Sequence, residues 1–241
     1  MLGKQILLLI SIIVGVLSIY LSIYLAINYN SSDKSSIEKY VESQGVERTE
    51  LKDKTLVFKG SSDETAMIFY PGANVEYNAY EPLMAACAKR GIMSFLIKMP
   101  LNLASLNFNA ANSIRKNYPD VKNWYIGGHS HGGQFAAVHV STYYKEYKGI
   151  IMLASISSFK DLSKLNIKAL SIIGSEDGIV TLDIYNRYKK KLPKSLTEYI
   201  IPGGCHSYFG MYGLQKKDGT PNITNIEQIE ITVDKISEFT K

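Results

Sequence analysis

The sequence predicts an α/β fold, in which helices cover both faces of a mostly parallel central sheet and one transmembrane helix precedes the folded domain. Three observations predict it. Short apolar runs alternate with amphipathic stretches along the chain, one junction between such segments carries the pattern Gly-x-Ser-x-Gly, and the chain begins with an uncharged apolar run. Strands that alternate with helices pair in parallel, because each helix returns the chain to the edge from which the next strand starts.

The apolar run at residues 6–27 contains no charged residue. As a helix it would be about 33 Å long, which matches the roughly 30 Å hydrocarbon core of a bilayer. A cleaved signal peptide is the alternative, but its apolar region is only about 7–15 residues long and ends in a small-residue cleavage site, which this run lacks. We therefore expect residues 1–27 to be an uncleaved transmembrane anchor. Lys4 precedes the run and charges of both signs balance after it, so we expect a single-pass protein of the cell membrane with its domain outside the cytoplasm.

The rest of the chain is divided into a short linker and one domain. Residues 28–36 are polar and lack apolar periodicity, so we expect a tether there. Residues 37–241 are long enough for one large core. Hydrophobic residues make up 46% of the chain and charged residues 20%, which is typical of a globular protein. The net charge of +5 has its densest run, Lys189–Lys191, at the end of a predicted helix, where cations are stabilising, so no nucleic-acid surface is predicted.

Within this domain each predicted strand is a short apolar run bounded by glycine, proline or polar residues. Each predicted helix has apolar side chains spaced three or four residues apart. The predicted strands are residues 55–58, 66–70, 93–97, 124–126, 149–153, 170–173 and 198–201. The predicted helices are residues 80–90, 103–117, 134–144, 182–192 and 226–239.

The pattern Gly128-His129-Ser130-His131-Gly132 lies between a predicted strand and a predicted helix. This context is the one that a nucleophile elbow requires, because glycines relieve the crowding of a very sharp turn and the serine is exposed at the helix N-terminus. The partial positive charge there, with the N–H of His131, would stabilise an oxyanion. A tight turn without chemistry is the alternative, which this short pattern does not exclude by itself.

An acid and a histidine follow the serine in the chain order of a Ser-Asp-His triad. Asp177 and His206 each come directly after a predicted strand, in glycine-containing loops. The expected roles are Ser130 as nucleophile, His206 as general base and then acid, and Asp177 as the carboxylate that fixes the imidazole tautomer. Asp161 follows the preceding strand and is the alternative acid, although Asp177 has the better turn.

Histidines and cysteines near these residues raise two further possibilities. His129 and His131 form a His-x-His pair, but no acidic or cysteine ligands lie near them in sequence, so neither a metal nor another cofactor is expected. Nothing in the spacing of Cys87 and Cys205 supports a disulfide. Cys205 precedes His206, and a small buried side chain explains it better than a functional thiol.

Four stretches, residues 69–75, 98–104, 127–133 and 202–213, resemble compact α/β-hydrolases of the dienelactone-hydrolase-related group, also called alpha/beta hydrolase fold-5. The resemblance covers most of the chain from about residue 55 onward and implies the α/β-hydrolase fold. The sheet is expected to begin near residue 50, so the outer antiparallel strands of larger hydrolases would be reduced or absent. Two departures are Ser130, where dienelactone hydrolases have cysteine, and Cys205, where asparagine is usual before the histidine.

The resemblance also implies further site residues. The loop after the strand at 66–70 would supply the second oxyanion-hole donor, the N–H of Ala73, with Gly72 keeping the loop thin and Asn74 beside the substrate pocket. A simple Pro-Gly turn is the alternative there. Apart from the resemblance, the aromatic residues directly after the histidine, including Tyr208 and Tyr212, are expected to narrow the pocket beside the base.

These features favour a membrane-anchored serine hydrolase that cleaves a small-molecule carboxylic ester or thioester through an acyl-enzyme. An acyltransferase with the same triad and a non-catalytic binding protein on the same fold remain alternatives, because a fold alone does not name a substrate. The segment at residues 155–165 is too short for a helical lid, so we expect small, soluble, short-acyl esters as substrates.

Overall fold

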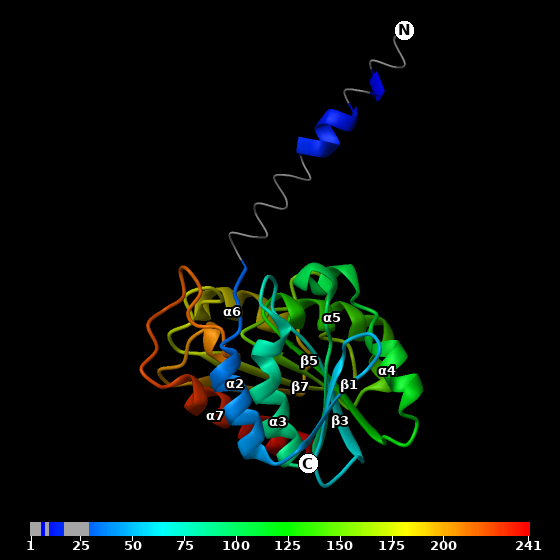
Figure 1. The fold of residues 1–241 in the computed structure, drawn as a ribbon, viewed down its shortest axis with the longest axis vertical. Helices are drawn as coiled ribbons and strands as arrows, with labels where there is room; N and C mark the ends of the chain where they lie inside the picture. Colours follow the sequence, from blue (N-terminus) through cyan, green and yellow to red (C-terminus); the bar gives the residue numbers. More distant parts are fainter. Residues whose placement is uncertain (1–5, 8–9, 17–28) are drawn as a thin grey trace.

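The computed structural model describes residues 6–7, 10–16 and 29–241, and residues 29–241 form an α/β domain around one sheet (Figure 1). The strands are β1 (Glu47–Glu50), β2 (Leu56–Lys59), β3 (Thr65–Tyr70), β4 (Ile92–Leu96), β5 (Asn123–His129), β6 (Gly149–Leu153), β7 (Lys168–Gly174) and β8 (Leu196–Ile201). They form an eight-stranded sheet in the order β1-β2-β4-β3-β5-β6-β7-β8. The pairs β1–β2 and β2–β4 are antiparallel and all the others are parallel. The predicted α/β fold with a mostly parallel sheet is therefore confirmed.

The expectation that the outer antiparallel strands would be reduced or absent is wrong. β1 pairs along its whole length with β2, which in turn pairs with β4. The sequence of β1 is Glu-Arg-Thr-Glu, and all four side chains are exposed. An edge strand of this kind pairs through its backbone hydrogen bonds and buries no side chain. Its sequence therefore lacks the alternation of apolar and polar residues by which a strand is usually predicted.

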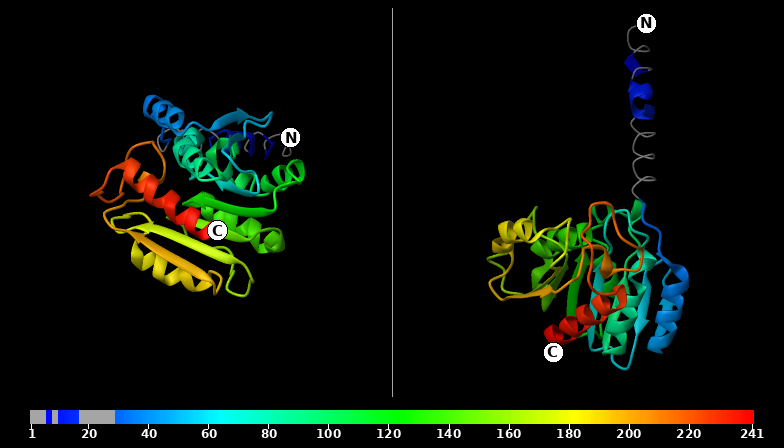
Figure 2. Two further views of the ribbon diagram at one scale, coloured as in Figure 1. Left: turned by 90° about the horizontal axis from the view of Figure 1, so that it is seen from below. Right: turned by 90° about the vertical axis from the view of Figure 1, so that its left-hand side faces the viewer.

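Helices cover both faces of the sheet (Figure 2). The α-helices are α2 (Lys34–Gln44), α3 (Glu81–Lys89), α4 (Ala111–Asn117), α5 (His131–Tyr143), α6 (Leu182–Tyr188) and α7 (Asn225–Thr240). Short 3₁₀ turns are η1 (Tyr77–Tyr80), η2 (Pro100–Asn102), η3 (Ala104–Leu106), η4 (Tyr144–Glu146), η5 (Lys189–Lys191) and η6 (Ser207–Phe209). The helix expected over residues 103–117 is thus shorter, because its first half forms η3 and an asparagine-containing turn.

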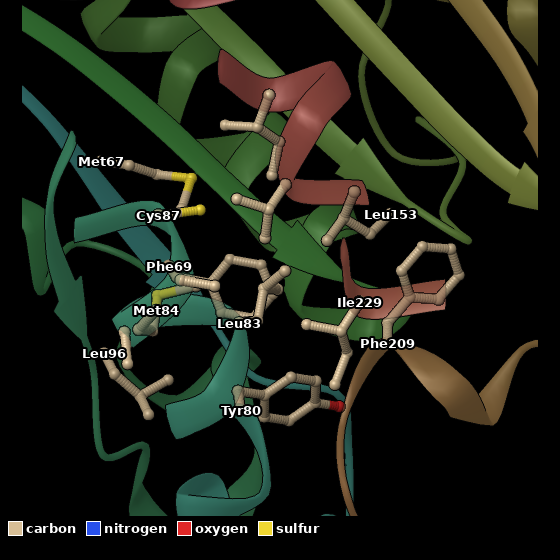
Figure 3. Packing of buried hydrophobic residues seen from close by; sticks show 14 of the residues in the cluster. Met67, Phe69, Tyr80, Leu83, Met84, Cys87, Leu96, Leu153, Phe209 and Ile229 are labelled. Atoms are coloured by element: carbon tan, nitrogen blue, oxygen red, sulfur yellow. The ribbon is translucent and has the colours of Figure 1, made fainter. Parts of the chain in front are cut away.

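The core consists of two apolar layers, one on each face of the sheet, and β3 contributes to both. Met67 and Phe69 point into the layer under α2, α3 and α7, whereas Ala66, Ile68 and Tyr70 point into the layer under α4, α5 and α6. Figure 3 shows the first layer, where side chains of β3 and α3 pack with those of α7 and of the loop after β8. The alternation of a strand's side chains between two faces explains why β3 is buried along nearly all its length.

The segment before α2 is fixed to the domain by backbone hydrogen bonds. The Asn30 N–H donates to the Asn74 carbonyl at 2.7 Å, and the Glu76 N–H donates to the Asn30 carbonyl at 2.9 Å. The Asp33 side chain then caps α2 by accepting the Ser36 N–H at 3.3 Å. Residues 34–36, which we expected to belong to a tether, are therefore the first turn of a helix. The polar character of these residues suggested a tether, but in the structure they supply the cap and the exposed face of α2.

The predicted anchor, residues 1–27, lies mostly outside the described residues. Its described parts, residues 6–7 and 10–16, are helical. No helix in the described part of the chain meets the length and apolarity that a membrane crossing requires.

A buried histidine on α5 predicts how the stability of the domain depends on pH. His139 donates from Nδ1 to the Asn109 side chain at 3.2 Å and accepts the Tyr147 hydroxyl at Nε2, at 2.9 Å. Burial, and then the charge of Arg115, lowers the pKa of His139 to about 4. The unfolded chain, in which the pKa is about 6.5, therefore takes up a proton that the folded chain does not.

Because of this difference in pKa, the folded state is favoured above pH 6.5, and this contribution to stability is lost as the pH falls toward 4. We expect the free energy of unfolding to drop by roughly 2–3 kcal/mol between pH 7 and pH 4 from His139 alone. Urea unfolding of the wild type and of His139→Gln at several pH values measures this drop. The two proteins share all other titrating groups, so the difference between their pH profiles is due to His139. Equal pH dependence in the two proteins would contradict the assignment.

Candidate active site

Ser130 occupies the sharp turn between β5 and α5, with φ 51° and ψ −120°. A non-glycine residue with positive φ is strained, and the surrounding structure must hold it there. The Ser130 carbonyl accepts the Ser155 hydroxyl at 2.6 Å, and the Ser130 N–H donates to the Leu153 carbonyl at 2.9 Å. Gly132 permits the turn, because a Cβ at that position would lie 2.1 Å from the Tyr70 carbonyl oxygen. The sequence pattern therefore forms the strained turn of a nucleophile elbow.

Asp177 and His206 meet beside this turn as a buried pair. Nδ1 of His206 lies 2.9 Å from Oδ2 and 3.2 Å from Oδ1 of Asp177. The Asp177 carboxylate also accepts the backbone N–H groups of Ile179 and Val180, at 2.9 and 2.7 Å. A carboxylate only accepts, so Nδ1 carries the proton and Nε2 is left as the basic nitrogen. Within the described residues, Nε2 is buried and has no hydrogen-bond partner.

The alternative acid, Asp161, is placed differently. Its carboxylate is exposed and accepts the Ser163 N–H at 2.9 Å, which stabilises a local turn after β6. Of the two candidate acids, the structure brings Asp177 to His206.

His129, the residue before the serine, connects three loops of the site. Its Nε2 donates to the backbone carbonyl of His206 at 2.9 Å, and its Nδ1 accepts the Tyr80 hydroxyl at 2.8 Å. The Tyr80 hydroxyl accepts in turn the Gly72 N–H at 3.1 Å. Burial, and then the nearby His206, keeps the pKa of His129 well below its usual value, so the ring stays neutral and these roles are preserved. The sequence indicated only a His-x-His pair here, because Tyr80 and His206 are far from it along the chain.

The loop after β3 lies close to the elbow, as an oxyanion hole requires. Gly72 is buried, and a Cβ there would lie 2.8 Å from both Nδ1 of His129 and the Tyr80 hydroxyl. The Asn74 N–H donates to the Asn102 carbonyl at 3.1 Å, so Asn74 fixes the far side of the loop. Between them, Ala73 is half-buried, and in the described structure neither its N–H nor that of His131 has a hydrogen-bond acceptor. These two amides are available to an oxyanion.

Asp218 is a site residue that the sequence analysis missed. Its Oδ1 accepts the backbone N–H of His206 at 3.1 Å and that of Gly178 at 3.3 Å, which joins the loop of His206 to the loop of Asp177. Its Oδ2 accepts the N–H and the hydroxyl of Ser207 at 2.7 and 2.6 Å. Burial raises the pKa of Asp218, but the hydrogen bonds from Ser207 and His206 outweigh it and lower the pKa below its usual range. No motif marks Asp218, because its role depends on two loops that meet only in the fold.

Replacing Asp218 by asparagine should disturb the position of His206. An amide keeps the shape but removes the charge and turns an NH₂ group toward these donors. Hydrogen bonds to a charged group contribute about 1.5–3 kcal/mol, so we expect kcat on a short ester to fall about 10- to 100-fold in Asp218→Asn. The exposed Asp120 offers a matched control, Asp120→Asn. A loss of thermal stability with unchanged kcat would show that Asp218 only stabilises the fold.

The aromatic residues after His206 are not all where they were expected. η6 turns the chain inward, so that Phe209 is fully buried and its ring centroid lies 5.6 Å from that of His129. Tyr212 is only 8% exposed and packs at 6.2 Å from the ring of Tyr80. Tyr212 therefore belongs to the core cluster behind the histidine loop, and Tyr208 alone of the three is half-exposed.

Cys87 and Cys205 are both buried and free, and the backbone of Cys205 is held by the Gln228 side chain through bonds of 2.9 and 2.8 Å. Residues 154–167 contain no helix, so this segment provides no helical lid. In the described residues, no group of three or more His, Cys, Asp or Glu side chains could hold a metal ion.

Comparisons with known proteins agree with this fold. Residues 66–230 match the sequence profile of the alpha/beta hydrolase family. A dienelactone hydrolase from Anabaena variabilis has 14% identity and a TM-score of 0.62, with 80% of this chain and 96% of that chain covered. An esterase of Pyrobaculum calidifontis has 15% identity and a TM-score of 0.58, with 85% and 92% covered. TT1662 from Thermus thermophilus has 11% identity and a TM-score of 0.60, with 81% and 98% covered. Among curated protein sequences, none matches this chain.

Proposed function

Because this chain belongs to the alpha/beta hydrolase family, we propose that it is a serine hydrolase that cleaves a carboxylic ester or thioester. The observation that carries the proposal is the buried His206–Asp177 pair beside a strained, half-buried Ser130. Two of the structural relatives, from Pyrobaculum calidifontis and Anabaena variabilis, are an esterase and a dienelactone hydrolase, which is consistent with ester chemistry.

The geometry supports the following sequence of steps. Nε2 of His206 accepts the proton of the Ser130 hydroxyl as Oγ attacks the carbonyl carbon of the ester. The oxyanion that forms is stabilised by the N–H groups of His131 and Ala73. His206 then gives the proton to the leaving alcohol or thiol, which departs and leaves the acyl group on Ser130. Water attacks the acyl-enzyme with His206 again as base, and the acid is released.

Hydrolysis of p-nitrophenyl esters of graded chain length, with and without an added alcohol, tests this function. We expect release of p-nitrophenol and of the free acid. Transfer of the acyl group to the alcohol in preference to water would favour an acyltransferase instead. The absence of turnover on every ester and thioester tried would contradict the proposal.

The N-terminal run is part of the same proposal: residues 1–27 hold the hydrolase at the membrane. We expect the full-length protein to resist extraction by carbonate or high salt, because extraction would expose a long apolar run to water. Sequencing of the mature N-terminus checks the alternative, since a start beyond residue 27 would indicate a cleaved signal peptide. Protease added to intact cells should digest the domain, and protection until lysis would reverse the topology.

A further inference from the structure

Exposed apolar side chains gather at one end of the domain. In residues 29–241, the large apolar side chains that are more than 40% exposed are Tyr29, Leu101, Leu106, Phe159, Ile200, Leu214 and Ile226. All except Ile200 lie at the edge of the sheet where the parallel strands end, here called the carboxyl edge. Leu101 and Leu106 follow β4, Phe159 follows β6 and Leu214 follows His206, whereas Ile200 lies within β8. Exposed apolar residues concentrated in this way indicate an interaction surface.

These side chains surround the candidate active site. Phe159 packs on Phe135 with ring centroids 5.4 Å apart, and Phe135 lies 4.7 Å from the ring of His131. On another side, Leu101 precedes Asn102, whose carbonyl accepts the N–H of Asn74 in the oxyanion-hole loop. Near the base, Leu214 precedes Gln215, whose N–H donates to the Ser207 hydroxyl at 2.9 Å. The apolar surface thus frames the nucleophile, the oxyanion-hole loop and the base.

The predicted anchor joins the domain at the same edge. Asn30 is bonded to Asn74, in the loop that carries Ala73, and Figure 1 shows the blue chain meeting the domain at its upper end, opposite the labelled C-terminus. The uncharged run ends at Ile27, three residues before Asn30. Three extended residues span about 10 Å at most. If the run spans the bilayer, the oxyanion-hole loop cannot lie far from the lipid surface.

The charges at this edge suit a lipid surface. Lys160 follows Phe159, and Lys216 and Lys217 follow Leu214, and all three are exposed. Lysines beside apolar side chains bind anionic headgroups while the apolar groups enter the interface, where tyrosines such as Tyr29 also concentrate.

We propose that the carboxyl edge rests on the membrane and that the enzyme takes a lipid ester directly from that surface. This inference rests on the proposed function and names its substrate class. An ester held in the interface would reach Ser130 without crossing water, so no lid is needed to cover an apolar site. It replaces the expectation of short, soluble esters, which depended partly on a pocket narrowed by Tyr212, a residue that the structure places in the core.

The test uses the full-length chain reconstituted in vesicles of phosphatidylcholine and phosphatidylglycerol. The combined variant Leu101→Gln, Leu106→Gln and Phe159→Gln makes the edge polar, and Ile200→Gln is the matched control away from it. We expect the combined variant to hydrolyse a long-chain acyl ester dissolved in the vesicles at least tenfold more slowly. Hydrolysis of soluble p-nitrophenyl acetate should change less than twofold in both variants, and Ile200→Gln should behave as the wild type on both substrates.

Equal vesicle activity in the combined variant and the wild type would overturn the inference, as would a wild type that cleaves the acetate and ignores the vesicle ester. A wild type that cleaves neither the vesicle ester nor p-nitrophenyl acetate would instead contradict the proposed function. A second variant, Phe159→Trp, tests contact directly. Vesicles with brominated lipids should quench the new tryptophan, since Trp124, the only native one, is buried. Absence of quenching beyond that of the wild type would also overturn the inference.

Discussion

Ser130→Ala is expected to lower kcat on a p-nitrophenyl ester by about 10⁴- to 10⁶-fold. The loss should be this large because, in the proposed mechanism, the hydroxyl forms the covalent intermediate, and the proposed oxyanion hole that remains could only assist direct attack by water. The Ser130 side chain caps no backbone group of α5, so its removal should leave the fold intact. Steady-state kinetics with burst-phase analysis measures the effect, and circular dichroism checks folding.

Ser141→Ala is the matched control, because Ser141 lies on α5, the helix that follows Ser130, and its hydroxyl donates to the nearby Val138 carbonyl at 2.7 Å. It should retain the wild-type rate. Residual turnover of Ser130→Ala above one percent of the wild type would mean that another group carries the reaction.

Asp177→Asn should lower kcat by about 10⁴-fold while the protein stays folded. An asparagine can still accept the N–H groups of Ile179 and Val180 through its oxygen, which preserves the loop. Its NH₂ group then faces Nδ1 of His206 and favours the tautomer with the proton on Nε2. In that tautomer Nε2 cannot accept the serine proton, so general-base catalysis is lost.

Asp161→Asn is the control for this prediction, since Asp161 is the other acid that follows a strand and its carboxylate only caps a local turn. It should keep nearly full activity. If Asp161→Asn shows the large loss and Asp177→Asn does not, the acid has been assigned to the wrong loop.

The parts of this structure that the sequence predicted well are those encoded locally. The central strands β3 and β6 are nearly continuous apolar runs, and the glycines around Ser130 mark one sharp turn, so a short window of sequence contains the whole signal. β1 and the start of α2 were missed for the opposite reason. Their side chains are mostly polar and exposed, and their positions depend on backbone pairing and on capping by Asp33.

Much of the candidate site depends on contacts between distant segments. Asp218 holds the loops of Asp177 and His206 together, and Tyr80 reaches His129 from another element altogether. Neither contact leaves a pattern in the sequence, because nothing distinguishes Asp218 or Tyr80 from the other acidic residues and tyrosines of the chain until the fold brings the segments together. The apolar surface at the carboxyl edge is likewise assembled from separate loops, each of which contributes only one or two residues.

Covalent labelling tests whether Ser130 is an activated nucleophile. The folded wild-type protein is treated with a fluorophosphonate, and the modified residue is located by mass spectrometry of its peptides. We expect a single adduct, on the peptide that contains Ser130, and none after the same treatment of urea-unfolded protein. An adduct on a different residue, or no adduct under conditions that label a known serine hydrolase completely, would contradict it.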